Sequence, residues 1–144
     1  MPDAPGVTPD PLDRLPHRGD ARLPDRIVIV EAGLRVGSTR TVRGDEPWIT
    51  GRGTMPPLML VELMAQTGGL LIDEGAAGRG DYAVLAGLRR MHMHDSARAG
   101  ETVTVECTLV RKLGDLYLVR CRGRADGREL AHGSLQLRLV RGGR

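Results

Sequence analysis

Alternating apolar and polar residues in the second half of the chain predict consecutive antiparallel strands. Residues 102–107 alternate with the period of two that marks a half-buried strand, and residues 129–140 place three leucines on one face. Turn residues interrupt this region twice, and one turn is Asp126-Gly127, a strong hairpin signal. The predicted strands are 82–88, 102–107, 116–124 and 129–140, with a turn at Gly114-Asp115.

The first half of the chain predicts two strands followed by one helix. The β-branched run 27–30 and the loosely alternating run 34–42 are separated by a glycine, so a hairpin is expected. From Leu58 to about Ala76 helix formers dominate, which predicts about five helical turns, loosened at Gly68-Gly69. Two strands, one apolar helix and several further strands predict an α+β fold, in which a curved antiparallel sheet wraps around one long central α-helix.

Length and composition fit a single folded domain. The chain has 144 residues, of which 40% are hydrophobic and 27% charged, and this is enough to bury a core. Five of the first twenty residues are prolines, so residues 1–13 are interpreted as a flexible leader and residues 14–144 as one domain. No apolar run reaches the roughly 18 residues of a spanning helix, and the N-terminus lacks a secretory pattern. We therefore expect a soluble, cytoplasmic protein with no membrane partner.

Charge and aromatic content argue against a protein that binds nucleic acid. The net charge is +3, but acidic residues are interspersed with the arginines, and aromatic residues make up only 2% of the chain. Proteins that bind single strands by base stacking need several exposed aromatic side chains. A mildly basic surface instead suits an acidic protein partner. Cys107 and Cys121 lack metal-site spacing and fit reduced residues within strands.

The predicted helix contains one unexpected charge. It is apolar nearly all round between positions 57 and 72, so it is expected to be the buried centre of the fold. Glu62 is its only charged residue there, and Gln66 lies one turn further on the same face. A carboxylate in such surroundings is costly unless it is paired, protonated or open to a cleft. Glu62 is therefore a candidate general acid or base, and the structural alternative is a salt bridge to an arginine.

Several short motifs, taken in order, resemble the 3-hydroxyacyl-acyl-carrier-protein dehydratases (FabZ-like) of the hotdog superfamily. They are Leu15-Pro16-His17-Arg18, Asp25-Arg26, Glu46-Pro47-Trp48, Met55-Pro56 and Glu62-Leu63-Met64-Ala65-Gln66, followed by Leu85-Ala86-Gly87-Leu88 and Ala99-Gly100-Glu101. The resemblance covers about residues 12 to 140. It implies a hotdog fold and a dimer, or a higher even oligomer, whose sheets join edge to edge.

The resemblance also implies a chemistry. The acyl chain is carried on the phosphopantetheine of acyl carrier protein and lies in a tunnel at the dimer interface, and no further cofactor is expected. A loop histidine of one subunit removes the α proton, and an acidic residue on the helix of the other protonates the departing hydroxyl. Backbone N–H groups near the helix start hold the thioester oxygen. The expected catalytic residues are Glu62 and Gln66, and the expected substrate-binding residues are Arg52, Gly53, Met55, Pro56 and Leu58.

The chain departs from the family pattern in the loop before the helix. The family has Gly-His-Phe-Pro there, whereas this chain has Gly51-Arg52-Gly53-Thr54, with about four residues fewer in the loop. A guanidinium does not give up its proton near neutral pH, so Arg52 cannot be the base. It is instead expected to pair with Glu62, to polarise a carbonyl or to hold the phosphate of the prosthetic arm.

None of the remaining histidines is a clear candidate to replace the missing loop histidine as the base. His17 lies in a segment whose family counterpart is not the base, so a structural role is expected. His92 and His94 lie two residues apart on a predicted strand and share one face. Two such histidines suit a metal pair, but no third ligand has suitable local spacing, and no metal site is expected. Their use as a base stays open, and His132 is expected at the surface without a partner.

Three functions remain open at this point. The first is an active dehydratase of fatty-acid or polyketide-type biosynthesis that uses Glu62 and a replacement base. The second is a non-catalytic homologue that binds acyl chains or acyl carrier protein. The third is a half-site subunit, in which Glu62 of this chain and a histidine of a homologous partner form one composite site in a heterodimer.

Overall fold

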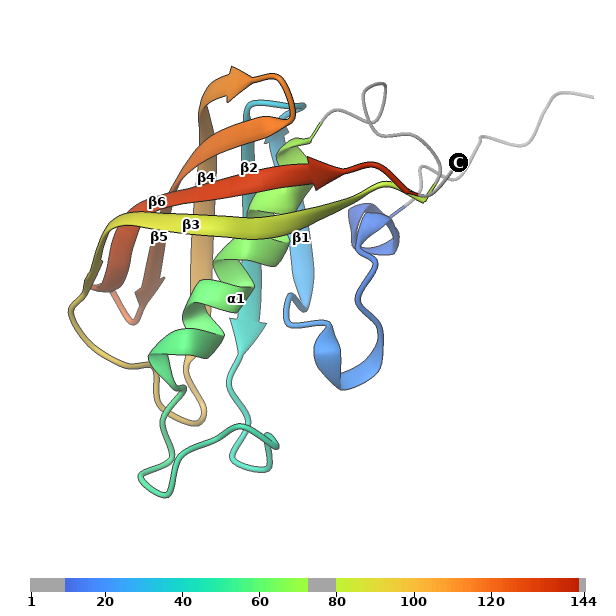
Figure 1. Ribbon diagram of the computed structural model, residues 1–144. Coiled ribbons are helices and arrows are strands. Elements are labelled where there is room, and N and C mark those ends of the chain that lie inside the picture. The colour runs from blue at the N-terminus through green and yellow to red at the C-terminus, as the bar shows by residue number, and fades with distance from the viewer. Residues whose placement is uncertain (1–9, 73–79, 143–144) are drawn as a thin grey trace, which may run out of the picture.

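The predicted strands form one antiparallel sheet in the computed structural model, which describes residues 10–72 and 80–142. The order across the sheet is β1-β2-β4-β5-β6-β3, and each neighbouring pair is antiparallel (Figure 1). The strands are β1 (Arg26–Glu31), β2 (Arg35–Thr41), β3 (Tyr82–Met93), β4 (Thr102–Leu113), β5 (Leu116–Ala125) and β6 (Arg128–Val140). The expected hairpins and the run of four antiparallel strands are confirmed, although β3 and β4 extend several residues beyond their predicted ends.

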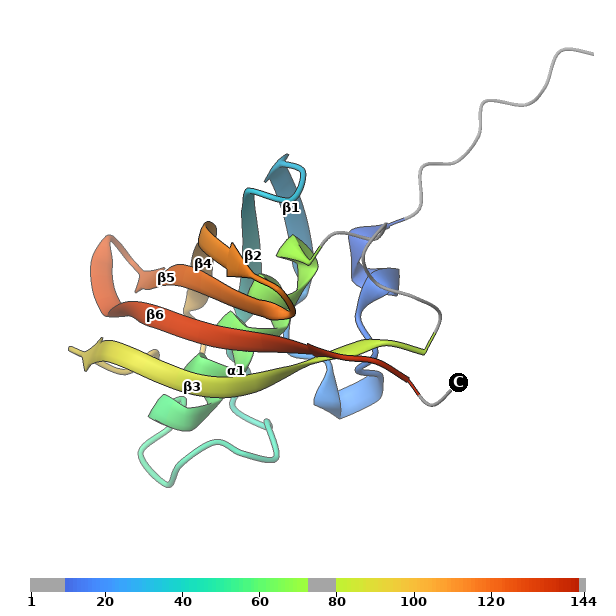
Figure 2. The ribbon, with the colours of Figure 1, turned by 45° about the horizontal axis from the view of Figure 1, so that its top comes forward.

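Helix α1 (Pro57–Gly68) lies against the inner face of this curved sheet, as Figures 1 and 2 show from two directions. Its buried residues Leu63 and Met64 are fully enclosed in the core. A Cβ atom at Gly68 would lie 3.3 Å from Leu137 and 3.4 Å from Val119, so glycine lets the helix approach the sheet closely. The α+β hotdog architecture predicted from the sequence is confirmed.

The helix ends earlier than predicted. At Gly69 it tightens into a 3-10 turn (Gly69–Leu71), which is the loosening expected at the two glycines. The predicted continuation through residues 73–76 lies outside the described residues. Among the helices that the structure describes, none is long and apolar enough to cross a membrane.

The chain before β1 is part of the folded domain from about residue 10 onward. Two 3-10 turns, Pro11–Arg14 and Gly19–Ala21, lead along the domain. Leu15 and Leu23 are 3% and 2% exposed and belong to the core, and Leu12 packs against it. Leu15 and Leu23 fall within the predicted domain 14–144, whereas Leu12 falls within the predicted leader and nevertheless packs against the core. Residues 1–9 of the predicted leader lie outside the described residues.

The two edges of the sheet expose apolar side chains. The outer strand β3 carries five of them, Tyr82, Val84, Leu85, Leu88 and Met93, and β1 carries Val28 and Val30. An edge strand also leaves a row of backbone N–H and C=O groups open to pairing with another strand. The β3 edge therefore combines unpaired backbone with exposed apolar surface, which is the combination that another sheet edge would cover.

A buried ion pair fixes the loop that follows β2. Arg40 and Glu46 are 5% and 6% exposed, and the Arg40 guanidinium donates to both carboxylate oxygens of Glu46. Arg40 also donates to the Leu23 carbonyl at 3.0 Å, lies 3.6 Å from Asp25, and stacks over the Trp48 ring at 5.9 Å from its centroid. These contacts join β2, the loop after it and the chain before β1 around one charge.

A second network ties the start of β6 to the connection between β3 and β4. Arg128 makes a two-pronged contact with Glu101, at 2.6 and 2.8 Å, and donates to Asp95 at 2.7 Å. The hydrogen bonds from Arg128 outweigh the effect of desolvation and lower the pKa of Glu101 from 4.5 to about 2. A pKa that is lower in the folded state means that the unfolded chain binds more protons between these values, so stability rises with pH there.

We expect the Glu101→Gln variant to lose part of this acid dependence. The ionised Glu101 stabilises the fold fully above pH 4.5, and its contribution disappears as the pH falls toward 2. Urea unfolding at pH 7, 5, 4 and 3 measures this contribution. The free energy of unfolding is expected to fall less steeply with decreasing pH in the variant than in the wild type. Glu31→Gln, at an exposed position with no ion pair among the described residues, is the matched control and keeps the wild-type slope. Equal slopes in wild type and Glu101→Gln would contradict the assignment.

Candidate functional site

One buried glutamine on α1 holds the chain segment before β1. Gln66 is 3% exposed, and its amide oxygen accepts a hydrogen bond from the Leu23 N–H at 2.9 Å. Its amide nitrogen donates to the Ala21 carbonyl at 2.8 Å and to Glu62 Oε1 at 3.1 Å. Because both ends of the amide are already engaged, the geometry favours a positioning role for Gln66 over the catalytic role expected from the sequence.

Glu62 is oriented by this glutamine but stays open to solvent. Its side chain is 41% exposed, so the central helix is not enclosed by the described residues on the side that carries Glu62. The sheet covers only one side of α1, and Leu58 in the first turn is 71% exposed. Oε1 receives the hydrogen bond from Gln66, while Oε2 has no hydrogen bond within residues 10–72 and 80–142. One carboxylate oxygen is therefore anchored and the other is available to a substrate.

His17 lies beside Glu62, a pairing that the sequence analysis missed. His17 Nε2 is 3.7 Å from Glu62 Oε1, and His17 Nδ1 is buried without a hydrogen-bond partner among the described residues. The two residues are far apart in the chain, and the hydrogen bonds between Gln66 and residues 21–23 bring them together. No local spacing signals this contact, so only the tertiary fold reveals it.

The loop before α1 is a compact turn. The Gly53 N–H donates to the Thr50 carbonyl at 2.9 Å, and Gly53 has a φ of +71°, a left-handed conformation that glycine adopts easily. Met55 is 2% exposed, and its N–H donates to the Ala97 carbonyl at 2.8 Å. The N–H groups of Gly53 and Met55 are thus engaged in hydrogen bonds within the fold, and the predicted substrate-binding roles of these two residues stay predictions.

The other predicted substrate-binding residues are more accessible. Arg52 is exposed at the tip of the turn, and among the described residues it forms no ion pair with Glu62. The predicted Arg52–Glu62 pair is thus absent from that part of the chain. Pro56 precedes the helix and Leu58 opens its first turn, where backbone N–H groups lack intrahelical partners. The exposed start of α1, Arg52 and Glu62 remain the candidate surface for an acyl thioester.

The fold and the comparison with a family model together define a dehydratase-like protein of the hotdog superfamily. The family model described as ApeP-like, ApeP dehydratase, matches residues 9–139. The chain belongs to the ApeP-like dehydratase family, so the resemblance found in the sequence is confirmed.

Curated relatives support this assignment along nearly the whole chain. The 3-hydroxyacyl-[acyl-carrier-protein] dehydratase FabZ of Herpetosiphon aurantiacus is 30% identical and aligns with 91% of this chain and 96% of its own length. The FabZ of Ruminiclostridium cellulolyticum is 28% identical, with 88% of this chain and 92% of the relative covered. In the solved structure of the dehydratase heterocomplex ApeI:P from Xenorhabdus doucetiae, one chain shares the fold with a TM-score of 0.77 at 19% identity, and 93% of each chain is covered.

Proposed function

We propose that this chain takes part in the dehydration of 3-hydroxyacyl thioesters carried on acyl carrier protein, with Glu62 as the acid/base group. The observation that carries the proposal is the Glu62 carboxylate, anchored at Oε1 by Gln66 and open at Oε2. A carboxyl group that is both oriented and accessible is what proton transfer to or from a bound substrate requires. The curated FabZ relatives bear the name of this activity.

The reaction assigns one proton to each of two groups. A base removes the α proton, the electron pair forms the carbon–carbon double bond, and the β C–O bond breaks. The hydroxyl leaves as water after taking the proton from Glu62, and the enoyl thioester remains. The reverse hydration uses the same groups with their roles exchanged, because both directions pass through the same transition state.

The base is supplied by a histidine of a partner subunit in this proposal. Arg52 stands where the family has its loop histidine and cannot accept a proton. The apolar edge of β3 offers a surface on which a homologous sheet would pair. The similar structure from Xenorhabdus doucetiae is a dehydratase heterocomplex, and this supports an arrangement with two different subunits. A homodimer of this chain alone would have two glutamates and no loop histidine.

A second candidate base lies within the chain itself. His17 Nε2 is 3.7 Å from Glu62 Oε1, so a substrate held over both side chains would lie within reach of an imidazole and a carboxyl group. In this arrangement the chain would act as a dehydratase without a different partner, and Arg52 would be free to bind the phosphate of the prosthetic arm.

The deciding experiment measures hydration of a carrier-linked enoyl thioester by the purified chain and by the chain co-purified with a His-bearing hotdog homologue. Turnover only in the complex is expected, with loss when the partner's loop histidine is changed. Turnover by the chain alone that disappears in His17→Gln would favour the second candidate. No turnover in either preparation, while carrier protein still binds, would overturn the catalytic proposal in favour of an acyl-binding homologue.

A further inference from the structure

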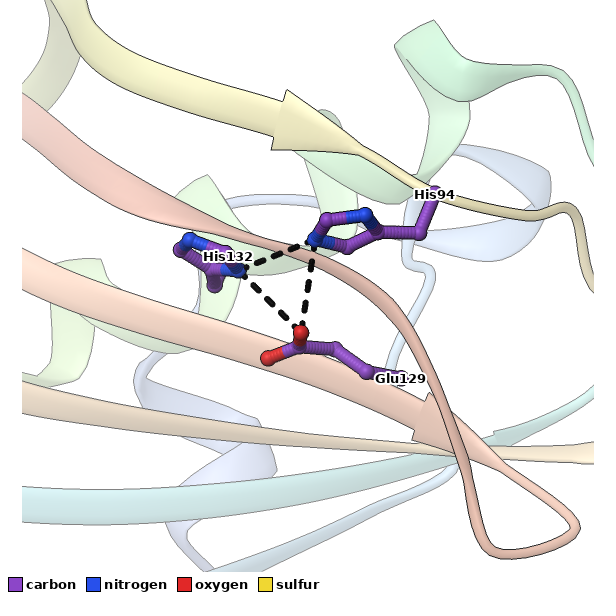
Figure 3. Close-up of side chains that lie close together, drawn as sticks. All are labelled: His94, Glu129 and His132. Carbon is purple, nitrogen blue, oxygen red and sulfur yellow. Dashed lines mark hydrogen bonds and ion pairs between the residues drawn. The ribbon is translucent and has the colours of Figure 1, made fainter.

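Three side chains from two neighbouring strands converge on one point, away from the site described above. His94 follows the end of β3, and Glu129 and His132 lie on β6 (Figure 3). His132 lies at the surface as expected, and the partners that its sequence neighbourhood did not indicate come from the tertiary fold. His132 belongs to the face of β6 opposite to Leu135 and Leu137, which are buried in the core. The cluster thus lies on the outer surface of the sheet, and its side chains are 31% to 44% exposed.

The three donor atoms form a nearly equilateral triangle. His94 Nε2 is 3.2 Å from His132 Nδ1 and 3.3 Å from Glu129 Oε2, and His132 Nδ1 is 3.2 Å from the same oxygen. Ligands about 2.0–2.1 Å from a zinc ion in tetrahedral geometry lie about 3.3–3.4 Å apart. The triangle thus matches one face of a zinc coordination tetrahedron. We propose that His94, Glu129 and His132 bind a divalent transition metal of the zinc type, with the fourth position open to solvent.

The fold holds these ligands in place from outside the cluster. Arg122 forms an ion pair with the other oxygen of Glu129, with Nε 2.8 Å from Oε1, which leaves Oε2 to the two imidazoles. The His94 N–H donates to the Leu130 carbonyl at 2.7 Å, and the His92 ring stacks on His132 with 5.1 Å between centroids. Two imidazoles and one carboxylate are donors that zinc accepts readily.

An irregularity in β3 brings His94 into reach. The register between β3 and β6 jumps between Arg89 and His92, so that Arg90 and Met91 together face the single residue Gly133. Arg90 has a φ of +49°, and a Cβ atom at Gly133 would lie 2.6 Å from the Met91 Cα. Such a bulge changes the direction of the side chains that follow it. The bulge therefore sets the position of His92, which pairs with His132, and of His94 just beyond the strand.

Arginine side chains surround the three ligands and make this part of the surface positively charged. Arg122 is paired with Glu129, and Arg90 and Arg120 line the adjoining groove of about 530 Å³, which His132 also borders. These guanidinium groups oppose a bare cation and favour an anion in the open fourth position. The two imidazoles and the carboxylate bind the metal ion. The nearby arginines favour an anionic fourth ligand that completes the coordination.

The test titrates Zn²⁺ into the full-length chain, freed of any affinity tag and treated with chelator, and follows binding by calorimetry and thermal unfolding. One Zn²⁺ per chain and a raised Tm are expected. His94→Gln, at an exposed position, and His132→Gln, at a half-buried one, are expected to abolish both effects without changing the circular dichroism of the apo protein. Glu31→Gln is the matched control, because it removes an exposed carboxyl from β1, at the opposite edge of the sheet, and it keeps binding within a few-fold of wild type.

Two results would overturn the proposal. One is the absence of saturable binding in the wild-type chain, which would leave the cluster as a hydrogen-bonded group of side chains. The other is equal Zn²⁺ binding and equal thermal shift in wild type and in His94→Gln, which would place any bound metal elsewhere on the protein. Neither result bears on the hydration assay, so the metal site and the proposed function are tested independently.

Discussion

Replacing Glu62 with glutamine is expected to lower the hydration rate of a carrier-linked enoyl thioester by about 10²–10⁴-fold, the usual contribution of one acid–base group. The amide keeps the size of the side chain and its hydrogen bond with Gln66, but it cannot deliver a proton. The measurement is kcat/KM in whichever preparation is active, the chain alone or its complex with a His-bearing homologue. Carrier binding is expected to stay within a few-fold of wild type.

The Glu62→Gln substitution is expected to lower activity without destabilising the fold. Because the Glu62 side chain is 41% exposed, the substitution is expected to change the free energy of unfolding by no more than about 0.5 kcal/mol. Glu31→Gln, exposed at the end of β1, serves as the matched control and retains full activity. Undiminished turnover in Glu62→Gln would remove this carboxyl from the mechanism.

The second large effect concerns stability. Changing Glu46 to alanine is expected to reduce the free energy of unfolding by about 3 kcal/mol, because it leaves the Arg40 guanidinium buried without its main partner. The value is placed at the lower end of the usual range because Asp25 remains 3.6 Å from Arg40. Urea unfolding at neutral pH provides the measurement.

The exposed neighbour Asp45 serves as the control for the effect of burial on the stability lost in Glu46→Ala. Asp45→Ala removes a carboxylate that is 89% exposed and 4.0 Å from Arg43, and it is expected to change stability by less than about 1 kcal/mol. Replacing both Arg40 and Glu46 with apolar residues of similar size is expected to recover much of the loss. A Glu46→Ala variant as stable as Asp45→Ala would contradict the assignment of a buried ion pair.

The elements of the fold follow from local patterns in the sequence. Alternation located the strands of the second half, and Asp126-Gly127 located the hairpin between β5 and β6 correctly. The glycine pair marked the point where α1 tightens. The packing of Leu12 against the core was not predicted because it is a tertiary contact, and a count of prolines carries no information about such contacts.

Only those site residues that lie on one secondary-structure element could be grouped from the sequence. Glu62 and Gln66 lie one turn apart on α1, so the helical period identified both. The contact of His17 with Glu62 was not predicted, because it depends on how residues 21–23 are bound to the helix. His132 and Glu129 were missed as partners of His94 for a similar reason. Their proximity depends on a strand register and a bulge, which local spacing does not reveal.

The amide of Gln66 also fixes how much negative charge the helix carries at this point. It donates to Glu62 and to the Ala21 carbonyl while accepting from the Leu23 N–H, and a carboxylate in its place would have no hydrogen to offer to two of these three partners. A glutamate there would also face Glu62 at hydrogen-bond distance, so the two acids would share a single proton. Glutamine at this position therefore leaves Glu62 as the single carboxyl group on this stretch of the helix, and no second acid competes with it for a substrate.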